Sequence, residues 1–147
     1  MLAYQFYKLQ DRYLSENESI KLHSKIADLM ASLSPVDYQK KILTHGGMAS
    51  TLFELACSYD NTILYAIIML DEHPAMNVNH HLDIFSPIYF ACRSGPEACD
   101  KTILLTKLLS MGANVNVSDF GITPLKTAKK NNNWRAMKLL LEHGALK

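Results

Sequence analysis

The cysteines are the residues of this chain best suited to covalent chemistry. Cys57, Cys92 and Cys99 are odd in number and form no CxxC pair, which indicates a reducing compartment without a disulfide framework. Cys57 and Cys92 each follow an alanine in an apolar segment, so we expect both to be small, buried core residues. Cys99 lies in an expected turn between two helices and is the candidate for an exposed, reactive thiol.

The histidine pair His80 and His81, followed by Asp83, is the candidate for half of a metal site. Adjacent residues of an extended segment point to opposite sides, and no further ligand stands at the spacing of a zinc site. The chain also lacks a glycine-rich phosphate loop, a G-x-S-x-G elbow, an H-E-x-x-H pair and a paired-acid motif. We therefore expect no metal, no cofactor and no enzymatic activity.

Composition narrows the class of protein further. A chain of 147 residues with 48% hydrophobic content can bury the core of one domain. Its 15 basic and 14 acidic residues give a net charge of +1, which favours neither a nucleic-acid nor a membrane partner. The longest apolar run is Ile63 to Leu70, far below the roughly 20 residues that span a bilayer. Lys8 and Arg12 interrupt the apolar N-terminus, so we expect no signal peptide and a cytoplasmic location.

The elements that would position these side chains repeat along the chain. A glycine followed by alanine recurs 32 positions apart, at Gly112 and Gly144. A hydroxyl residue followed by proline recurs 37 positions apart, at Pro87 and Pro124, so the earlier unit carries an insertion, which fits within Gly95–Lys101. A near-fixed period of this size predicts stacked helical repeats rather than a globular enzyme.

A third copy lies upstream, where Thr51–Cys57 keeps the Ala-Cys pair of the next unit but lacks the proline. The segment Asn77–Asn79 that ends this copy matches Asn114–Asn116 of the following one. Three copies are about the minimum for a stable stack.

The last unit carries most of the family signal. Thr123, Pro124, Leu125 and Ala128 match a T-P-L-H-x-A signature, with Lys126 in place of the histidine. These residues resemble the ankyrin repeat family, whose unit is a β-turn followed by two antiparallel helices. The resemblance implies an all-α ankyrin-repeat solenoid with short β-hairpin loops. The implied repeats span about residues 47–79, 80–115 and 116–147.

Residues 1–46 lack that signature and are predicted to form an N-terminal helical cap. A helical stripe runs from Leu2 to Tyr13, and a second helix begins after Ser15, where Glu18 stands at capping-box spacing. A third helix is expected from Pro35 to a Leu-Thr-His-Gly ending at residues 43–46. We expect the second and third helices to form a degenerate first repeat without a hairpin, with the first helix covering its open face.

In the family that the chain resembles, partners bind the concave face formed by hairpin tips and inner helices. The resemblance therefore implies a monomeric, non-catalytic module for protein–protein interaction. Arg93 and Lys130 in neighbouring repeats would add a positive strip, which favours an acidic or amphipathic helical ligand. The implied hairpin contacts are His81, Leu82, Asp83, Ile84, Phe85, Ser118, Asp119 and Phe120. The implied inner-helix contacts are Leu55, Tyr59, Phe90, Arg93, Ser94, Thr127, Lys130 and Asn131.

Several alternatives stay open at this level. The apolar tip residues either face a partner or fold inward onto the neighbouring hairpin. The polar residues 129–133 either cap the stack or the chain is part of a longer protein. The chain could also be the targeting or substrate-recognition arm of a larger enzyme, or of a secreted bacterial effector acting in the host cytosol. Asn116 occupies the hairpin asparagine that is hydroxylated in some ankyrin proteins, although bonding of the hairpin backbone also explains an asparagine there.

Overall fold

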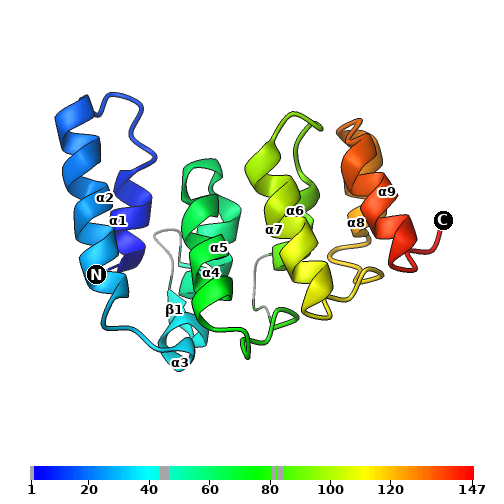
Figure 1. Ribbon diagram of the computed structural model, residues 1–147, viewed down its shortest axis with the longest axis horizontal. Coiled ribbons are helices and arrows are strands. Elements are labelled where there is room, and N and C mark those ends of the chain that lie inside the picture. Colours follow the sequence, from blue (N-terminus) through cyan, green and yellow to red (C-terminus); the bar gives the residue numbers. More distant parts are fainter. Residues whose placement is uncertain (1, 44–46, 81, 83–84) are drawn as a thin grey trace.

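The computed structural model describes residues 2–43, 47–80, 82 and 85–147, and this part of the chain is mostly helical (Figure 1). The helices are α1 (Leu2–Lys8), α2 (Glu16–Met30), α3 (Pro35–Gln39), α4 (Leu52–Ser58), α5 (Ile63–Glu72), α6 (Pro87–Cys92), α7 (Cys99–Ser110), α8 (Pro124–Lys130) and α9 (Trp134–Glu142). A 3-10 turn, Asp60–Thr62, precedes α5, and two short strands are β1 (Ile42–Leu43) and β2 (Ala49–Ser50). The predicted all-α character is confirmed.

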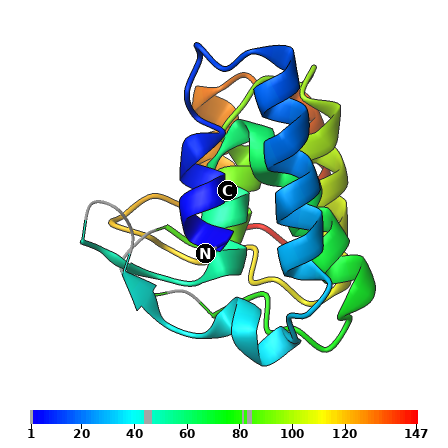
Figure 2. The ribbon, with the colours of Figure 1, turned by 90° about the vertical axis from the view of Figure 1, so that its left-hand side faces the viewer.

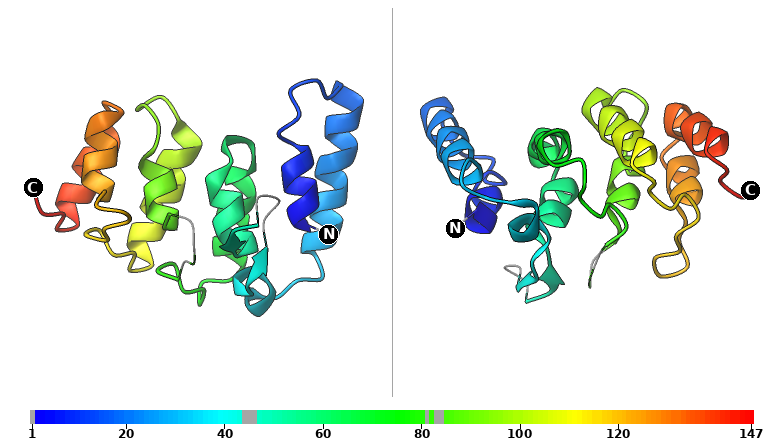
Figure 3. Two further views of the ribbon diagram at one scale, coloured as in Figure 1. Left: turned by 180° about the vertical axis from the view of Figure 1, so that it is seen from behind. Right: turned by 60° about the horizontal axis from the view of Figure 1, so that its bottom comes forward.

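The helices lie in antiparallel pairs arranged in a row (Figures 1 and 3). The pairs are α1 with α2, α4 with α5, α6 with α7 and α8 with α9. Helices α1, α4, α6 and α8 contact one another in that order and form an inner layer, whereas α5, α7 and α9 form an outer layer. Figure 2 shows that the loops at the base of the pairs project to the side on which α1 lies. The inner helices and these loops therefore border the same face, which we call the inner face.

The helix starts follow the capping residues of the sequence. The Thr123 hydroxyl accepts a hydrogen bond from the Lys126 N–H, and Pro124 fills the first helical position, where no N–H is needed. Thr51 caps α4 in the same way. The Ser15 and Glu18 capping box at the start of α2 is also present. The capping box predicted at Ser15 and Glu18 is therefore confirmed.

Three side-chain amides, each near the base of the row, bond the backbone of the next loop along the chain. In each case the amide oxygen accepts from one backbone N–H and the amide nitrogen donates to one carbonyl, at distances of 2.6–3.3 Å. The bridges join Gln39 to Asn77, Asn79 to Gly112 and Asn114, and Asn116 to Gly144 and Leu146. Neighbouring pairs are thus connected by polar bonds at the base as well as by apolar packing.

The apolar core runs through the whole row, between the two layers. Its largest fully buried aliphatic side chains come mainly from the outer helices: Ile26, Ile63, Met69, Leu104, Leu105, Leu108 and Leu140. Gly112 and Gly144, with φ of 89° and 91°, end α7 and α9 in the left-handed region, where a side chain would be strained. Each of these two helices is therefore followed by the residue type that adopts this conformation without strain.

The N-terminal region differs from its prediction. Helix α3 ends at Gln39, and Ile42–Leu43 is a strand that pairs antiparallel with Ala49–Ser50, so the third helix expected to reach residue 46 was wrong. Lys40 already has an extended backbone, and the β-branched Ile42 favours the strand that follows. Residues 44–46 lie outside the described part of the chain.

The first helix pair is also composed differently. Helix α1 packs against α2 and α4, so α1 and α2 form the pair that was expected from the second and third helices. Five residues make α3 only about 7.5 Å long, too short to lie along α2. The apolar stripe predicted from Leu2 to Tyr13 is buried only as far as Leu9, and Tyr13 is 80% exposed. No described helix combines the length and apolar character needed to cross a membrane.

Candidate partner-binding surface

Four aromatic rings from two loops and one inner helix meet on the inner face. We call Phe85, Tyr89, Phe90 and Phe120 the aromatic cluster. The Phe85 ring stacks on Tyr89 with centroids 3.9 Å apart, and it meets the edge of Phe120 at 5.1 Å. Phe90 is buried beneath, with its centroid 6.5 Å from that of Phe85. Of the two alternatives for the tips, Phe85 packs inward, whereas Phe120 stays 78% exposed.

Phe120 occupies a two-residue hairpin turn. Asp119 and Ile122 exchange both backbone hydrogen bonds, at 3.0 and 2.9 Å, and Phe120 and Gly121 between them have φ of 53° and 79°. Positive φ at both central residues is the type I′ turn, for which Asn-Gly is the favoured pair. A left-handed backbone costs an ordinary side chain about 1–2 kcal/mol. The chain therefore places a bulky, exposed ring at a strained position.

Asp119 has a structural place in this surface. Its side chain is 6% exposed, and its Oδ2 accepts from the Ser86 N–H at 3.0 Å and from the Ser86 hydroxyl at 2.5 Å. Ser86 precedes α6, so this bond ties the α8 hairpin to the loop of the preceding pair. The Ser86 side chain makes no capping bond to α6, and its bond to Asp119 holds Phe120 beside Phe85. Asp119, which was predicted as a partner contact, is thus buried and bonded within the molecule.

Basic side chains flank the aromatic cluster. The Arg93 guanidinium lies 5.0 Å from the centroid of the buried Phe90 ring and donates a hydrogen bond to the Ser58 carbonyl at 3.1 Å. Helix α8 next to it exposes Lys126, Lys129 and Lys130 and contains no acidic residue. This end of the inner face therefore favours a negatively charged ligand.

The remaining predicted contacts are distributed between core and surface. Thr127 is 4% exposed and Leu55 6%, so neither is an exposed position of its helix as expected. Asn131 is half-buried and donates to the Thr127 carbonyl at 2.8 Å. Ser94 is half-buried, and its hydroxyl oxygen has no hydrogen-bond partner among the described residues. Such a group is costly to bury unless water reaches it.

The hairpin before α6 is described only in part. Leu82 is half-buried, and Ser118 in the neighbouring hairpin is exposed. His81, Asp83 and Ile84 lie outside the described residues, so their predicted part in the surface and in a metal site stays a prediction. Tyr59, at the end of α4, is half-buried.

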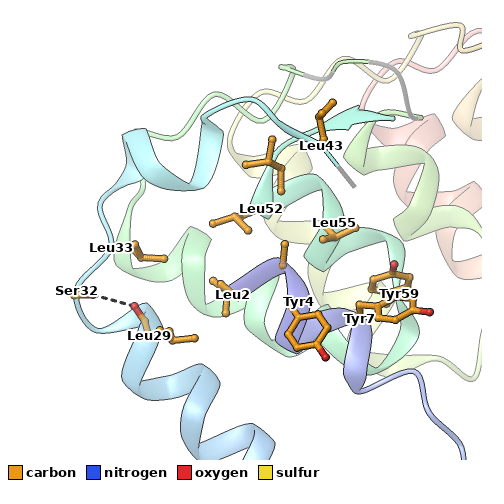
Figure 4. Close-up of a pocket in the computed structure, with 12 residues that line it drawn as sticks. Leu2, Tyr4, Tyr7, Leu29, Ser32, Leu33, Leu43, Leu52, Leu55 and Tyr59 are labelled. Atoms are coloured by element: carbon orange, nitrogen blue, oxygen red, sulfur yellow. Dashed lines mark hydrogen bonds between the residues drawn. The ribbon is translucent and has the colours of Figure 1, made fainter. Parts of the chain in front are cut away.

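A pocket of about 490 Å³ opens between α1 and α4, a feature that sequence reasoning missed (Figure 4). The end of α2 and strand β1 complete its walls, and the lining residues that the structure describes are all uncharged. They are Leu2, Ala3, Tyr4, Tyr7, Leu29, Ser32, Leu33, Ile42, Leu43, Leu52, Leu55 and Tyr59. Two of them, Leu55 and Tyr59, belong to the predicted inner-helix contacts, so the pocket extends the predicted surface toward the N-terminus.

Tyrosine rings group at one end of this apolar pocket (Figure 4). Tyr4 and Tyr7 remain 54% and 41% exposed, which is unusual for large rings beside so many leucines. Burial raises the pKa of Tyr59, and the nearby phenol of Tyr7 raises it further. At the pocket mouth Leu43 is 70% exposed, so an apolar side chain there has solvent on one side.

The thiols are placed largely as expected. Cys57 and Cys92 are buried, and desolvation raises the pKa of both, that of Cys92 to about 12, so neither forms a thiolate at neutral pH. Cys99 is exposed as predicted, although it begins α7 instead of lying in the turn before it.

The site contains no arrangement that points to metal chemistry in the part of the chain that the structure describes. No three His, Cys, Asp or Glu side chains there come close enough together to hold an ion. No protein-family model matches this chain, and no curated protein matches it. Any function must therefore be argued from the surface itself: an aromatic cluster with a flanking cationic helix at one end and an uncharged pocket at the other.

Proposed function

We propose that the chain is an ankyrin-type repeat module that binds a partner protein through its inner face and catalyses no reaction. Recurring local geometry supports the ankyrin-type interpretation. The Asn79 N–H bonds the Asn77 side chain at 3.0 Å, and 37 positions later the Asn116 N–H bonds the Asn114 side chain at 2.9 Å. This local turn comes before each predicted hairpin.

The observation that carries the binding proposal is Phe120. A phenylalanine in the left-handed region destabilises the turn, and 78% exposure to water recovers little of that loss by burial. Backbone strain of this kind persists at sites of function more often than elsewhere. A partner that covers the ring would bury it and make the strained position favourable in the complex.

The chemistry around Phe120 suits a protein ligand. Interface hot spots are enriched in aromatic residues and arginine, and here Arg93 lies against the same group of rings. The exposed lysines of α8 extend this surface with positive charge. An acidic, amphipathic segment that lays apolar side chains on the cluster and carboxylates on α8 would be complementary to it.

The test compares two double variants that are matched in chemistry and exposure. Phe120→Ala with Arg93→Glu alters the proposed site, and Tyr13→Ala with Arg135→Glu alters one exposed ring and one exposed arginine elsewhere. Each protein is immobilised, and the proteins it captures from a cell extract are quantified by mass spectrometry. We expect partners that bind the unaltered chain and the Tyr13 variant but are lost from the Phe120 variant. Equal capture by all three, with circular dichroism showing intact folds, would exclude this surface.

A further inference from the structure

The apolar pocket between α1 and α4 is a second feature of the inner face that needs an occupant. We infer that it receives two or three large, uncharged side chains of the same partner segment, whose acidic residues then reach α8. This inference rests on the proposed function and adds a polarity to the ligand: an apolar end over the pocket and an acidic end over the lysines.

The size of the pocket sets how much of a ligand it can hold. A cavity of about 150 Å³ in a protein core holds one benzene molecule. The 490 Å³ pocket is about three times as large, so it can accept two or three large apolar side chains. A helix offers such a group at positions i, i+3 and i+4 or i+7.

Charge decides which end of the ligand lies here. The described lining residues carry no charge, so a carboxylate placed among the leucines would lose hydration without gaining a cation. Helix α8, two inner helices further on, exposes Lys126, Lys129 and Lys130 and has no acidic residue of its own. A segment that is uncharged at one end and acidic at the other therefore fits the face in one direction only.

The two ends are connected by continuous contacts. Tyr59 lines the pocket and follows Ser58, whose carbonyl accepts the hydrogen bond of Arg93. Arg93 in turn lies over Phe90, a member of the aromatic cluster. These contacts connect the pocket with the aromatic cluster across α4 and α6, and α8 packs against α6.

The spacing of the helices predicts the length of that ligand. Packed helices lie about 8–10 Å apart, and the pocket, between α1 and α4, is about two and a half such steps from α8. The apolar and acidic groups should therefore be about 20–25 Å apart, which corresponds to about 13–17 residues of a helix at 1.5 Å per residue.

The test uses a displayed library of random 24-residue peptides, selected on the complete chain and then sequenced. The affinity of each enriched peptide is then measured for two variants of the chain. Leu43→Asp puts a charge at the pocket mouth, and Leu64→Asp on the outer helix α5 is its control. The two leucines are 70% and 61% exposed, so neither change disturbs the core. A second comparison uses two double variants. One carries Lys126→Glu and Lys130→Glu on α8, and its control carries Arg135→Glu and Lys138→Glu on α9.

We expect enriched peptides with an apolar group and an acidic group about 13–17 residues apart. Their affinity should fall at least tenfold with Leu43→Asp and with the α8 variant, but less than twofold with either control. Peptides whose affinity is unchanged by Leu43→Asp but falls with Phe120→Ala would refute the proposed role of the pocket and leave the proposed function standing. Peptides whose affinity is unchanged by all these variants would refute both the inference and the proposed function. So would a failure to enrich any peptide beyond its level in a selection on an unrelated protein. Apolar peptides without acidic groups that still need Leu43 would refute the polarity.

Discussion

The Asp119 carboxylate bonds Ser86 in the neighbouring helix pair, so we expect its removal to lower the stability of the protein. We expect Asp119→Ala to destabilise the protein while leaving its helix content unchanged. Both side chains are almost fully buried, at 6% and 4% exposure, so water cannot replace the lost acceptor. The Ser86 N–H and hydroxyl would then remain buried without their carboxylate partner.

The magnitude follows from these two bonds. A hydrogen bond to a charged group contributes about 1.5–3 kcal/mol. Since both bonds share the Oδ2 atom, we take the lower end for each and expect a loss of about 3 kcal/mol. For a chain of this size that loss lowers Tm by about 6–12 °C. Ser86→Ala, which removes only the hydroxyl bond, should cost about half as much.

Urea unfolding gives the measurement, followed by circular dichroism and by the fluorescence of the single tryptophan, Trp134. Ser118→Ala, at an exposed neighbouring position, is the control and should change the free energy of unfolding by less than about 0.5 kcal/mol. The double variant of Ser86 and Asp119 completes a thermodynamic cycle. A loss below about 1 kcal/mol for Asp119→Ala, or a coupling energy near zero, would contradict the role given to this bond.

Three further predictions test other parts of the structure. Phe120→Asn and Phe120→Ala both remove the ring, but asparagine tolerates the left-handed turn. The free energy of unfolding of the Asn variant should therefore be about 1 kcal/mol higher than that of the Ala variant. Equal stability of the two would argue against strain at this turn. With a disulfide-exchange reagent at neutral pH, Cys99 should react quickly and the other two thiols only after unfolding, whereas Cys99→Ser should leave no fast phase. Hydrogen bonds from the Ser34 N–H and hydroxyl lower the pKa of Asp37, so its stabilisation is present above the ordinary aspartate pKa and disappears as the pH falls through the lowered value. Asp37→Asn should therefore be less stable than the unaltered chain at pH 7, and the difference in the free energy of unfolding should shrink as the pH falls below the ordinary aspartate pKa. A difference that does not change with pH would refute this cause.

Short-range signals predicted the helices best. Thr51 and Thr123 cap helices because their partner N–H lies three residues away, which a sequence displays directly. Gly112 and Gly144 end helices for an equally local reason. Signals of this kind involve residues only a few positions apart, so the sequence displays both partners together.

Long-range pairs account for what was missed. Asp119 and Ser86 are 33 positions apart, and nothing near either residue indicates that they bond. The pocket is formed by segments from α1 to α4, none of which is unusual alone. The first helix pair was assigned to the wrong helices because the pattern did not reveal that α3 ends after five residues.

The amide bridges at the base of the row have a consequence for how this chain tolerates changes in length. Each bridge bonds both an N–H and a carbonyl of the next loop, so an added residue near Asn79 or Asn116 would break two bonds at once. At the opposite edge, Asn61 bonds the Leu9 carbonyl and the Gln10 side chain, and Arg93 bonds the Ser58 carbonyl. The loop at residues 93–98 between α6 and α7 is longer than the loops between α4 and α5 and between α8 and α9, and the Arg93 bond lies at its first residue. A short tag or a reporter domain inserted after Glu97 should therefore leave the helix pairs aligned and the inner face open.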